Sequence, residues 1–260
     1  MEIIIKPNAA EAQQEAAKIL RRQIQRQPAS VLGLATGSTP IPVYAALVQM
    51  HGQGELDFSR VVTFNLDEYV GLASDHPCSY REFMRQHLFG KVNTTPKSIH
   101  FPDGLAKDIP AHCADYEAAI VRAGGIDLQL LGIGRDGHIG FNEPSSSLAS
   151  RTRIKTLTPQ TVKDNAKCFG SPDKVPRHVI TMGVGTIMDA RRCLLLATGE
   201  AKADVVSRMA EGPLTADVPA SILQMHPACT LVVDEAAAAK LKRTEYYRWV
   251  YDNKPDWQRV

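Results

Sequence analysis

The stretch of residues 132–143 holds the densest group of chemically capable side chains in this sequence. One histidine, His138, stands between two carboxylates, Asp136 and Glu143, and glycines on both sides let the backbone approach a ligand closely. A carboxylate beside an imidazole orients its tautomer and raises its pKa, so the ring can carry a proton near neutral pH. A metal site and a packed structural histidine are the alternatives, but nearby residues supply none of the extra His or Cys ligands that zinc usually takes. The stretch therefore favours acid–base chemistry without a metal.

A second pair of carboxylates, Asp67 and Glu68, follows an apolar run. Two adjacent side chains at a strand end cannot both point the same way, so one can face a cleft while the other caps a helix or pairs with a base. A carboxylate in a partly dry pocket can act as general base toward a carbon acid. A solvated turn is the alternative. The pair therefore marks a candidate base whose role the neighbouring motifs must decide.

The turn Thr36-Gly37-Ser38-Thr39 suits an anion. A glycine-bearing turn between a strand and a helix presents free backbone N–H groups and the positive end of the helix dipole, and small hydroxyls add donors. The turn is not a Walker A loop, because no Gly-Lys-Ser/Thr follows. The alternative is a well-capped helix start, with Thr39 as N-cap and Pro40 at the first helical position.

Basic side chains occur in two further places. Lys202 lies early in a helix that follows a strand, where it can reach an anion as a point charge, although a surface lysine is the alternative. Arg151, Arg153 and Lys155 share one face if their segment is extended. That cluster is a second candidate phosphate site, or a solvated charged face.

The elements that must position these residues alternate between strand and helix. Asn8 and Glu11 have capping-box spacing at the start of a helical pattern that runs to about residue 25. The alternation predicts an α/β fold with a mostly parallel sheet and helices on both faces, whose ligands bind beyond the carboxyl ends of the strands. The three motifs above follow the first three of these predicted strands. The strands are residues 31–35, 61–64, 126–131, 194–197 and 230–233.

The bulk composition bounds the class of protein. The chain has 260 residues, 44% of them hydrophobic and 22% charged, with a formal net charge of +2. These values are typical of one globular domain and give no electrostatic argument for nucleic acid. No run approaches the roughly 20 apolar residues of a membrane span, and the N-terminus lacks the apolar run of a signal peptide.

The five cysteines, Cys78, Cys113, Cys168, Cys193 and Cys229, are spread along the chain without a C-x-x-C. This pattern predicts free thiols in a reducing compartment, with neither a disulfide framework nor a zinc site. With the missing signal peptide, it predicts a cytoplasmic protein. We find no linker or repeat, so we expect a single domain over residues 1–260. Residues 157–177, rich in Pro, Gly and polar side chains, are either a mobile lid or a long surface connection.

Taken together, the motifs resemble glucosamine-6-phosphate deaminase, also called the isomerase. The resemblance covers nearly the whole chain, and its second and third motifs are long and specific. The matching segments are residues 32–40, 65–72, 134–144, 150–152, 184–186 and 223–227. It implies a Rossmann-like fold, no redox cofactor, and the conversion of glucosamine-6-phosphate and water to fructose-6-phosphate and ammonia.

The resemblance also implies catalytic roles. Asp67 resembles the base that moves a proton from C2 to C1 of the sugar, and His138 resembles the residue that assists opening of the pyranose ring. Asp136 and Glu143 resemble the carboxylates that hold and tune the histidine. Two acid–base centres then match two chemical steps, because a closed sugar must open before its C2 hydrogen becomes acidic.

The phosphate of the substrate is expected on Gly37, Ser38 and Thr39, with Lys202 as countercharge. Some relatives carry arginine in the lid where this chain carries Lys167. A lysine keeps the charge and loses the bidentate geometry, so Lys167 is a weaker phosphate ligand by this argument.

Some members of the family are activated by N-acetylglucosamine-6-phosphate at a subunit interface. Ser146, Arg153, Lys155 and Thr156 resemble that allosteric phosphate site, and a homo-oligomer, hexamer or trimer, is implied with it. In such members the C-terminal tail, here residues 246–260, carries a further aromatic contact.

Two other functions fit parts of this pattern. A 6-phosphogluconolactonase shares the fold type but is a hydrolase with no need of Asp67 as a carbon base. A non-catalytic sugar-phosphate sensor usually carries a DNA-binding module, for which 260 residues leave no room. The expected partner is therefore a small sugar phosphate, and neither nucleic acid nor a membrane.

Overall fold

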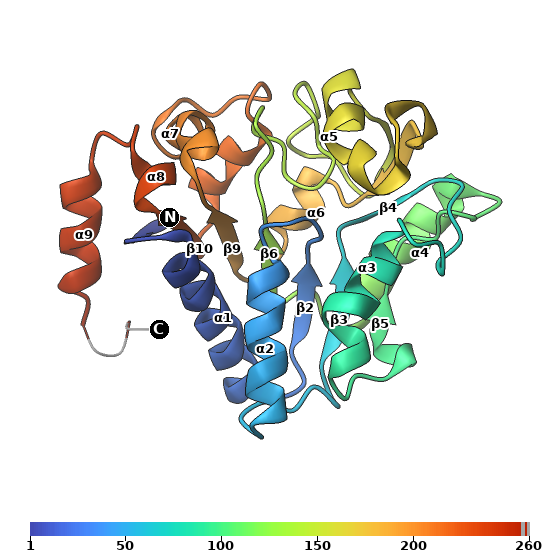
Figure 1. The fold of residues 1–260 in the computed structure, drawn as a ribbon, viewed down its shortest axis with the longest axis horizontal. Coiled ribbons are helices and arrows are strands. Elements are labelled where there is room, and N and C mark those ends of the chain that lie inside the picture. The colour runs from blue at the N-terminus through green and yellow to red at the C-terminus, as the bar shows by residue number, and fades with distance from the viewer. Residues whose placement is uncertain (256–257, 259–260) are drawn as a thin grey trace.

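A computed structural model describes residues 1–255 and 258 of the chain. Its main sheet has seven parallel strands in the order β1-β10-β9-β6-β2-β3-β5 (Figure 1). The strands are β1 (Glu2–Lys6), β2 (Val31–Leu34), β3 (Val62–Asn65), β5 (Ile99–His100), β6 (Leu128–Leu131), β9 (Cys193–Ala197) and β10 (Cys229–Asp234). The predicted parallel α/β sheet is confirmed, and each predicted strand lies within two residues of an observed one.

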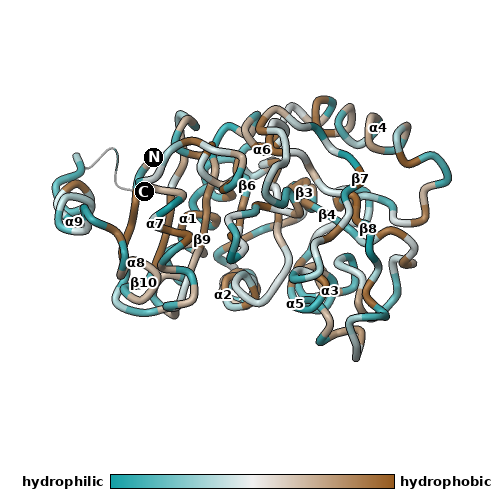
Figure 2. Tube along the Cα trace, turned by 90° about the horizontal axis from the view of Figure 1, so that it is seen from above, coloured by the Kyte–Doolittle hydropathy of each residue, from teal (hydrophilic) through white to brown (hydrophobic). Residues whose placement is uncertain are grey.

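Helices cover both faces of this sheet, and each face has its own apolar core. Figure 2 shows α2 and α3 on one side and α4 and α6 on the other. The helices are α1 (Ala9–Arg26), α2 (Ile41–Gly52), α3 (Tyr80–His87), α4 (Ile109–Arg122), α5 (Pro159–Phe169), α6 (Val184–Met188), α7 (Ala203–Glu211), α8 (Glu235–Ala238) and α9 (Thr244–Asp252). Strands buried on both faces explain the continuous apolar runs in the sequence.

The sequence predicts the N-terminal caps of two helices, α1 and α2. The predicted start of α1 at Asn8 is confirmed, because Asn8 Oδ1 accepts from the backbone N–H of Glu11. The Glu11 carboxylate accepts from the side-chain amide of Asn8 and not from its backbone N–H, so one of the two bonds of a capping box is formed. The predicted cap of α2 is wrong. That helix begins at Ile41 after Pro40, without a side-chain cap, so Thr39 lies in the preceding turn.

A second, three-stranded antiparallel sheet adjoins the carboxyl end of β3. It has the order β4-β8-β7, with β4 (Asp67–Tyr69), β8 (His178–Thr181) and β7 (Arg153–Thr156). Its register pairs Asp67 with Thr181 and Arg153 with the same Thr181. The three residues therefore form one row across the sheet, and since neighbouring strands lie about 4.8 Å apart, the row is about 10 Å long.

The segment 157–177, here called the lid segment, is mostly helical. Thr158 caps α5 by accepting from Thr161 N–H, Pro159 begins the helix, and Gly170 ends it with a positive φ of 80°. Figure 1 shows α5 at the end of the molecule toward which β2 points. The segment is therefore an ordered helix placed near the strand ends that carry the motifs, not an irregular surface connection.

The cysteine prediction is partly wrong. Cys78 and Cys168 form a disulfide that joins the loop before α3 to the last turn of α5, across 90 residues of sequence. Cys113, Cys193 and Cys229 are free and buried. A pairing of two residues so far apart depends on how the folded chain places the end of α5 beside the loop before α3, which the spacing of the cysteines does not reveal.

No helix within the described part of the chain is both long enough and apolar enough to cross a lipid bilayer.

Candidate active site

Asp67 is the first residue of β4, two residues beyond the end of β3. Only 5% of its surface is exposed. Burial raises the pKa of Asp67 to about 8, with a further rise from the negative charge of Glu68 and an opposing effect from His138. A carboxyl group with a pKa near neutrality can take a proton from a weak carbon acid and give it back.

Glu68 points elsewhere, as expected for adjacent carboxylates at a strand end. Its two oxygens accept backbone N–H bonds from Tyr69, Tyr80 and Arg81, each at 3.0 Å. The last two N–H groups belong to the first turn of α3, so Glu68 fixes the start of that helix to β4. Glu68 therefore caps a helix, as expected for one of the two carboxylates, while Asp67 is buried.

His138 lies between its two carboxylates. Its Nδ1 atom is 2.7 Å from Asp136 Oδ1 and 3.6 Å from Glu143 Oε2. Burial alone would lower the pKa of His138, but the bonds and charges of Asp136 and Glu143 outweigh it and raise the pKa to about 9. The same pairing holds the pKa of Asp136 below its usual range, against the effect of burial. The imidazole is therefore an imidazolium at neutral pH, ready to donate.

A glycine is required opposite this ring. A Cβ atom at Gly134 would overlap the imidazole of His138. Gly137, with a φ of +95°, turns the chain between Asp136 and His138 in a conformation that side chains rarely adopt. These two glycines let the loop fold the histidine back against its own backbone.

The ligand atoms of Asp136, His138 and Glu143 lie within 4.8 Å of one another, a spacing that a metal ion could use. In an imidazolium, however, both ring nitrogens carry a proton, so neither Nδ1, which faces both carboxylates, nor Nε2 has a lone pair for a metal. The arrangement therefore fits an ion-paired acid better than a metal centre.

The two acid–base centres meet at Gly140 and Thr181. A Cβ atom at Gly140 would stand 3.6 Å from Asp67 Oδ2 and 3.0 Å from Thr181 Oγ1. The backbone N–H of Phe141 donates to Thr181 Oγ1 at 3.0 Å. Thr181 is fully buried and is paired with Asp67 in the small sheet. It thereby joins the histidine loop to the strand of the candidate base, a role that no sequence signal indicated.

The lid segment reaches the same site through Glu143. Oε1 of Glu143 accepts a hydrogen bond from Thr161 Oγ1 at 2.6 Å and longer contacts from Thr158, while Oε2 faces His138. Thr161 is the one buried residue of α5. The sequence interpretation missed it, although the Thr158-Pro159 pair is a helix-start signal that would have placed Thr161 in a first turn.

The candidate phosphate ligands comprise an exposed turn and two lysines. Gly37 has a φ of +103° with open space around its Cβ position, and Gly37 and Ser38 are exposed. Lys202 is half-buried and donates to the carbonyl of Ile133 at 2.6 Å, which ties it to the histidine loop. Burial lowers the pKa of Lys202, with Arg135 acting in the same direction. Lys167 is exposed on α5 and, among the described residues, makes no hydrogen bond or ion pair.

The predicted allosteric residues lie on and before β7. Arg153 donates to Asn142 Oδ1 at 2.9 Å, and Asn142 in turn donates to the carbonyls of Ile139 and Met182. Lys155 and Thr156 follow on the same strand, and Ser146 is buried with no hydrogen bond from its hydroxyl among the described residues. Arg153 is therefore two hydrogen bonds from the backbone of the histidine loop.

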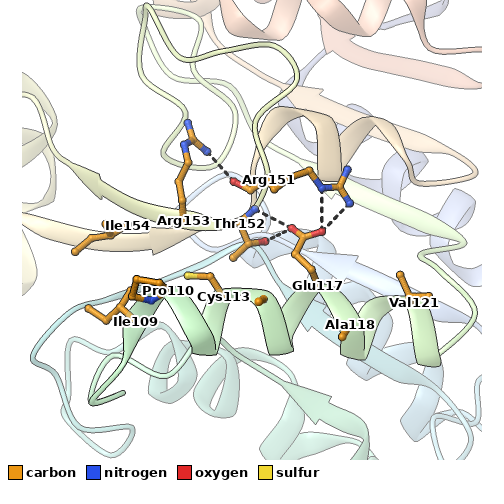
Figure 3. A pocket seen from close by; sticks show the side chains of 11 residues that line it. Ile109, Pro110, Cys113, Glu117, Ala118, Val121, Arg151, Thr152, Arg153 and Ile154 are labelled. Atoms are coloured by element: carbon orange, nitrogen blue, oxygen red, sulfur yellow. Dashed lines mark hydrogen bonds and ion pairs between the residues drawn. The ribbon is translucent and has the colours of Figure 1, made fainter.

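A groove of about 620 Å³ separates α4 from β7, as seen in Figure 3. Across it, Glu117 binds the guanidinium of Arg151 and both the N–H and the hydroxyl of Thr152. Arg153 and Ile154 line the same groove. It lies on the β7 side of the small sheet, whereas Asp67 lies on β4.

Comparison with known proteins identifies the family. Residues 6–232 match the family described as glucosamine-6-phosphate isomerases/6-phosphogluconolactonase. The chain belongs to this family. A relative from Arthrobacter sp. (strain FB24), named glucosamine-6-phosphate deaminase, is 57% identical over 258 residues, 99% of each chain. One from Pseudarthrobacter chlorophenolicus with the same name is 55% identical over the full length of both.

Solved structures of the glucosamine-6-phosphate isomerase/6-phosphogluconolactonase family agree with this fold. One described as a monomeric glucosamine-6-phosphate deaminase superposes with a TM-score of 0.90 at 43% identity, covering 92% of this chain and 100% of that one. A 6-phosphogluconolactonase from Trypanosoma cruzi gives 0.75 at 23% identity, covering 93% and 97%. The second likeness concerns the fold alone.

Proposed function

We propose that this chain deaminates glucosamine-6-phosphate, giving fructose-6-phosphate and ammonia. The observation that carries the proposal is the meeting of two acid–base centres, a buried carboxyl group at Asp67 and a charged histidine at His138, across Gly140. The names of relatives more than 50% identical over the whole chain support the same reaction.

The chemistry follows from the two pKa values. His138, held as an imidazolium by Asp136 and Glu143, gives a proton to the ring oxygen as the pyranose opens. Asp67 then takes the C2 proton and returns it at C1, which turns the aldose skeleton into a ketose skeleton. The resulting imine is hydrolysed by water, and ammonia leaves. A lactonase would use no proton transfer between carbons and so would have no need of a carboxyl group tuned as Asp67 is.

The phosphate group is proposed to lie on Gly37, Ser38 and Thr39. The exposed turn with free donors supports this placement. Lys202, which precedes α7 and bonds the carbonyl of Ile133, supplies a countercharge, and Lys167 supplies one from the lid segment when a ligand is bound. The whole chain is proposed to act as one domain with residues 157–177 as its lid, because Thr161 of that segment binds Glu143.

An ammonia-release assay with glucosamine-6-phosphate tests this function. The wild-type chain should release ammonia and form fructose-6-phosphate, and the variant Asp67→Asn should lose at least about 1000-fold in kcat while still binding the sugar phosphate by calorimetry. Activity of the variant within tenfold of wild type would remove Asp67 from the proton-transfer step.

Regulation by N-acetylglucosamine-6-phosphate is a second part of the proposal. Ser146, Arg153, Lys155 and Thr156 would bind its phosphate, and the bond from Arg153 to Asn142 supports a route to the histidine loop. The rate should then be sigmoidal in substrate and become hyperbolic with the acetylated sugar phosphate. A hyperbolic curve that the effector does not change would contradict this part.

A trimer or hexamer is proposed together with that regulation, because the allosteric site that these residues resemble lies at a subunit interface. Val121 and Ile154, exposed by 72% and 44% at the α4–β7 groove, support an interface there. The solved relative at 43% identity is described as monomeric, so the state is open to a direct test. Light scattering that gives the mass of one chain at micromolar concentration would contradict an oligomer. A cytoplasmic location is proposed as well, because the substrate is a phosphorylated sugar.

A further inference from the structure

The disulfide between Cys78 and Cys168 joins the lid segment to the fixed side of the active site. Cys78 lies next to Ser79, which caps α3, and α3 is held to β4 by Glu68. Cys168 is the tenth residue of the eleven-residue helix α5. The covalent bond therefore ties the end of the lid helix to the element that carries Asp67.

The lid helix is otherwise held by non-covalent contacts alone. Its first turn is held by Thr161 on Glu143, and Thr161 is the one residue of the helix that is buried. Near its other end, the ring of Phe169 packs against Tyr69 and His76, at 5.3 and 6.3 Å between ring centroids. Val162 and Ala166 also pack, partly buried, against the apolar cluster that holds Tyr69 and Phe141. The disulfide is the covalent restraint on the end of α5 that carries Lys167.

The two cysteines of the pair differ in exposure. Cys168 is an exposed residue and Cys78 is half-buried, which makes Cys168 the better target for a thiolate from solution. The three other cysteines, Cys113, Cys193 and Cys229, are buried thiols. Thiol chemistry under native conditions is therefore directed to this one pair.

We propose that Cys78 and Cys168 are a redox site that sets the mobility of the lid. One thiolate of a dithiol reductant attacks the Cys168 sulfur, forms a mixed disulfide and displaces Cys78 as a thiolate, which takes up a proton. The second thiol of the reductant then attacks its own sulfur in the mixed disulfide and releases Cys168. The reductant loses two electrons and two protons and becomes a disulfide, and the protein gains two thiols.

The opened pair frees the carboxyl end of α5, while Thr161 keeps its other end on Glu143. The helix can then swing away from the strand ends to admit substrate and release product. Where lid opening limits turnover, the reduced protein is the faster form. This effect on rate rests on the proposed deaminase function, but the effect on the lid does not.

The test uses the full chain in two states, treated with a dithiol or with a mild disulfide oxidant and then freed of reagent. Thiol titration of the unfolded protein should find five thiols in the reduced state and three in the oxidised state. Amide exchange in α5 should be at least tenfold faster in the reduced state. The kcat for ammonia release should be at least threefold higher in the reduced state.

A variant with both Cys78→Ser and Cys168→Ser is the matched control. It should exchange and turn over like the reduced protein in both states, and circular dichroism should show an unchanged fold. Cys168→Ser alone serves as the second variant and should behave the same way.

Five thiols after oxidation, or equal exchange of α5 in the two states, would overturn the proposal. So would a redox effect that persists in the double variant. If neither state releases ammonia, the proposed function fails, while the thiol count and the exchange rates still decide the redox site.

Discussion

The carboxylate of Glu143 holds the hydroxyl of Thr161, with 2.6 Å between Oε1 and Oγ1. The other oxygen of the same carboxylate faces His138, so one side chain is shared between the lid and the proposed acid. The position of α5 and the charge on the imidazole are therefore linked through a single carboxylate.

Thr161→Val tests this link, because it keeps the shape of the side chain and removes the donor. A hydrogen bond to a charged group contributes about 1.5–3 kcal/mol, so we expect kcat/KM to fall roughly 10-fold or more. Thr161→Ser should restore most of it. Gln160→Ala is the control, because Gln160 directly precedes Thr161 and is exposed. If Thr161→Val behaves like that control, the lid contact has no part in turnover.

The pH dependence of kcat/KM follows from the two raised pKa values. Asp67 must be a carboxylate to act as base, so the rate rises as pH passes about 8, and His138 must be an imidazolium to act as acid, so the rate falls as pH passes about 9. We therefore expect kcat/KM to have a narrow maximum between these two pH values. Because Asp67 and His138 interact, the apparent pKa values of the two limbs describe the pair together. His138→Asn should remove the falling limb. A flat profile from pH 7 to 10 would contradict these assignments.

The burial of Asp67 also predicts a stability effect. A carboxyl group whose folded-state pKa is raised to about 8 stabilises the fold fully below its ordinary pKa, and this contribution is lost as pH rises toward 8. Asp67→Asn stays neutral, so its free energy of unfolding should exceed that of wild type by an amount that grows by up to about 1.4 kcal/mol per pH unit. Urea unfolding at pH 5 and pH 8.5 measures this.

Asp136→Asn is the matched contrast to that variant, because the folded-state pKa of Asp136 lies below its ordinary value. This variant should be less stable than wild type at neutral pH. Equal stability of Asp67→Asn and wild type at pH 8.5 would mean that Asp67 is better solvated than its burial implies.

Lys202→Ala should mainly raise KM, by roughly 10- to 100-fold, because a phosphate anchor binds the ground state and the transition state alike. Lys240→Ala is a suitable control, since Lys240 is an exposed lysine paired with Asp204. An unchanged KM for Lys202→Ala, or a loss confined to kcat, would show that Lys202 serves the histidine loop through Ile133 instead.

The five inner strands of the main sheet could be predicted from the sequence because they are buried on both faces, which demands continuous apolar runs such as residues 194–197. The edge strands β1 and β5 are only partly buried and were not predicted. The small sheet could not. β4 is the tripeptide Asp67-Glu68-Tyr69, and β7 alternates half-buried with exposed residues. Strands as short and polar as β4 and β7 have no apolar signal, and only β8 carries a buried apolar pair, Val179 and Ile180. The pairing of the three strands depends on where the larger sheet places the chain.

The residues of the candidate site likewise divide into those that the sequence indicates and those that only the fold reveals. Asp67, Asp136, His138 and Glu143 could be selected because acid–base chemistry requires their types at strand ends. Thr181 and Thr161 could not, because a hydroxyl has no special chemistry until the fold gives it a partner. The Cys78–Cys168 pair was missed for a related reason: each cysteine is isolated in sequence, and only the fold brings the end of α5 to the loop before α3.

The register of the small sheet, which aligns Asp67, Thr181 and Arg153 in one row, limits where residues can be inserted in the chain. Side chains alternate between the two faces of a strand, so one residue inserted in β8 would turn Thr181 to the opposite face and misalign both neighbouring strands together. An insertion at residues 170–174, in the turn after α5, would meet no such constraint. Homologous chains should therefore vary in length within the lid turn and keep β8 constant to the residue.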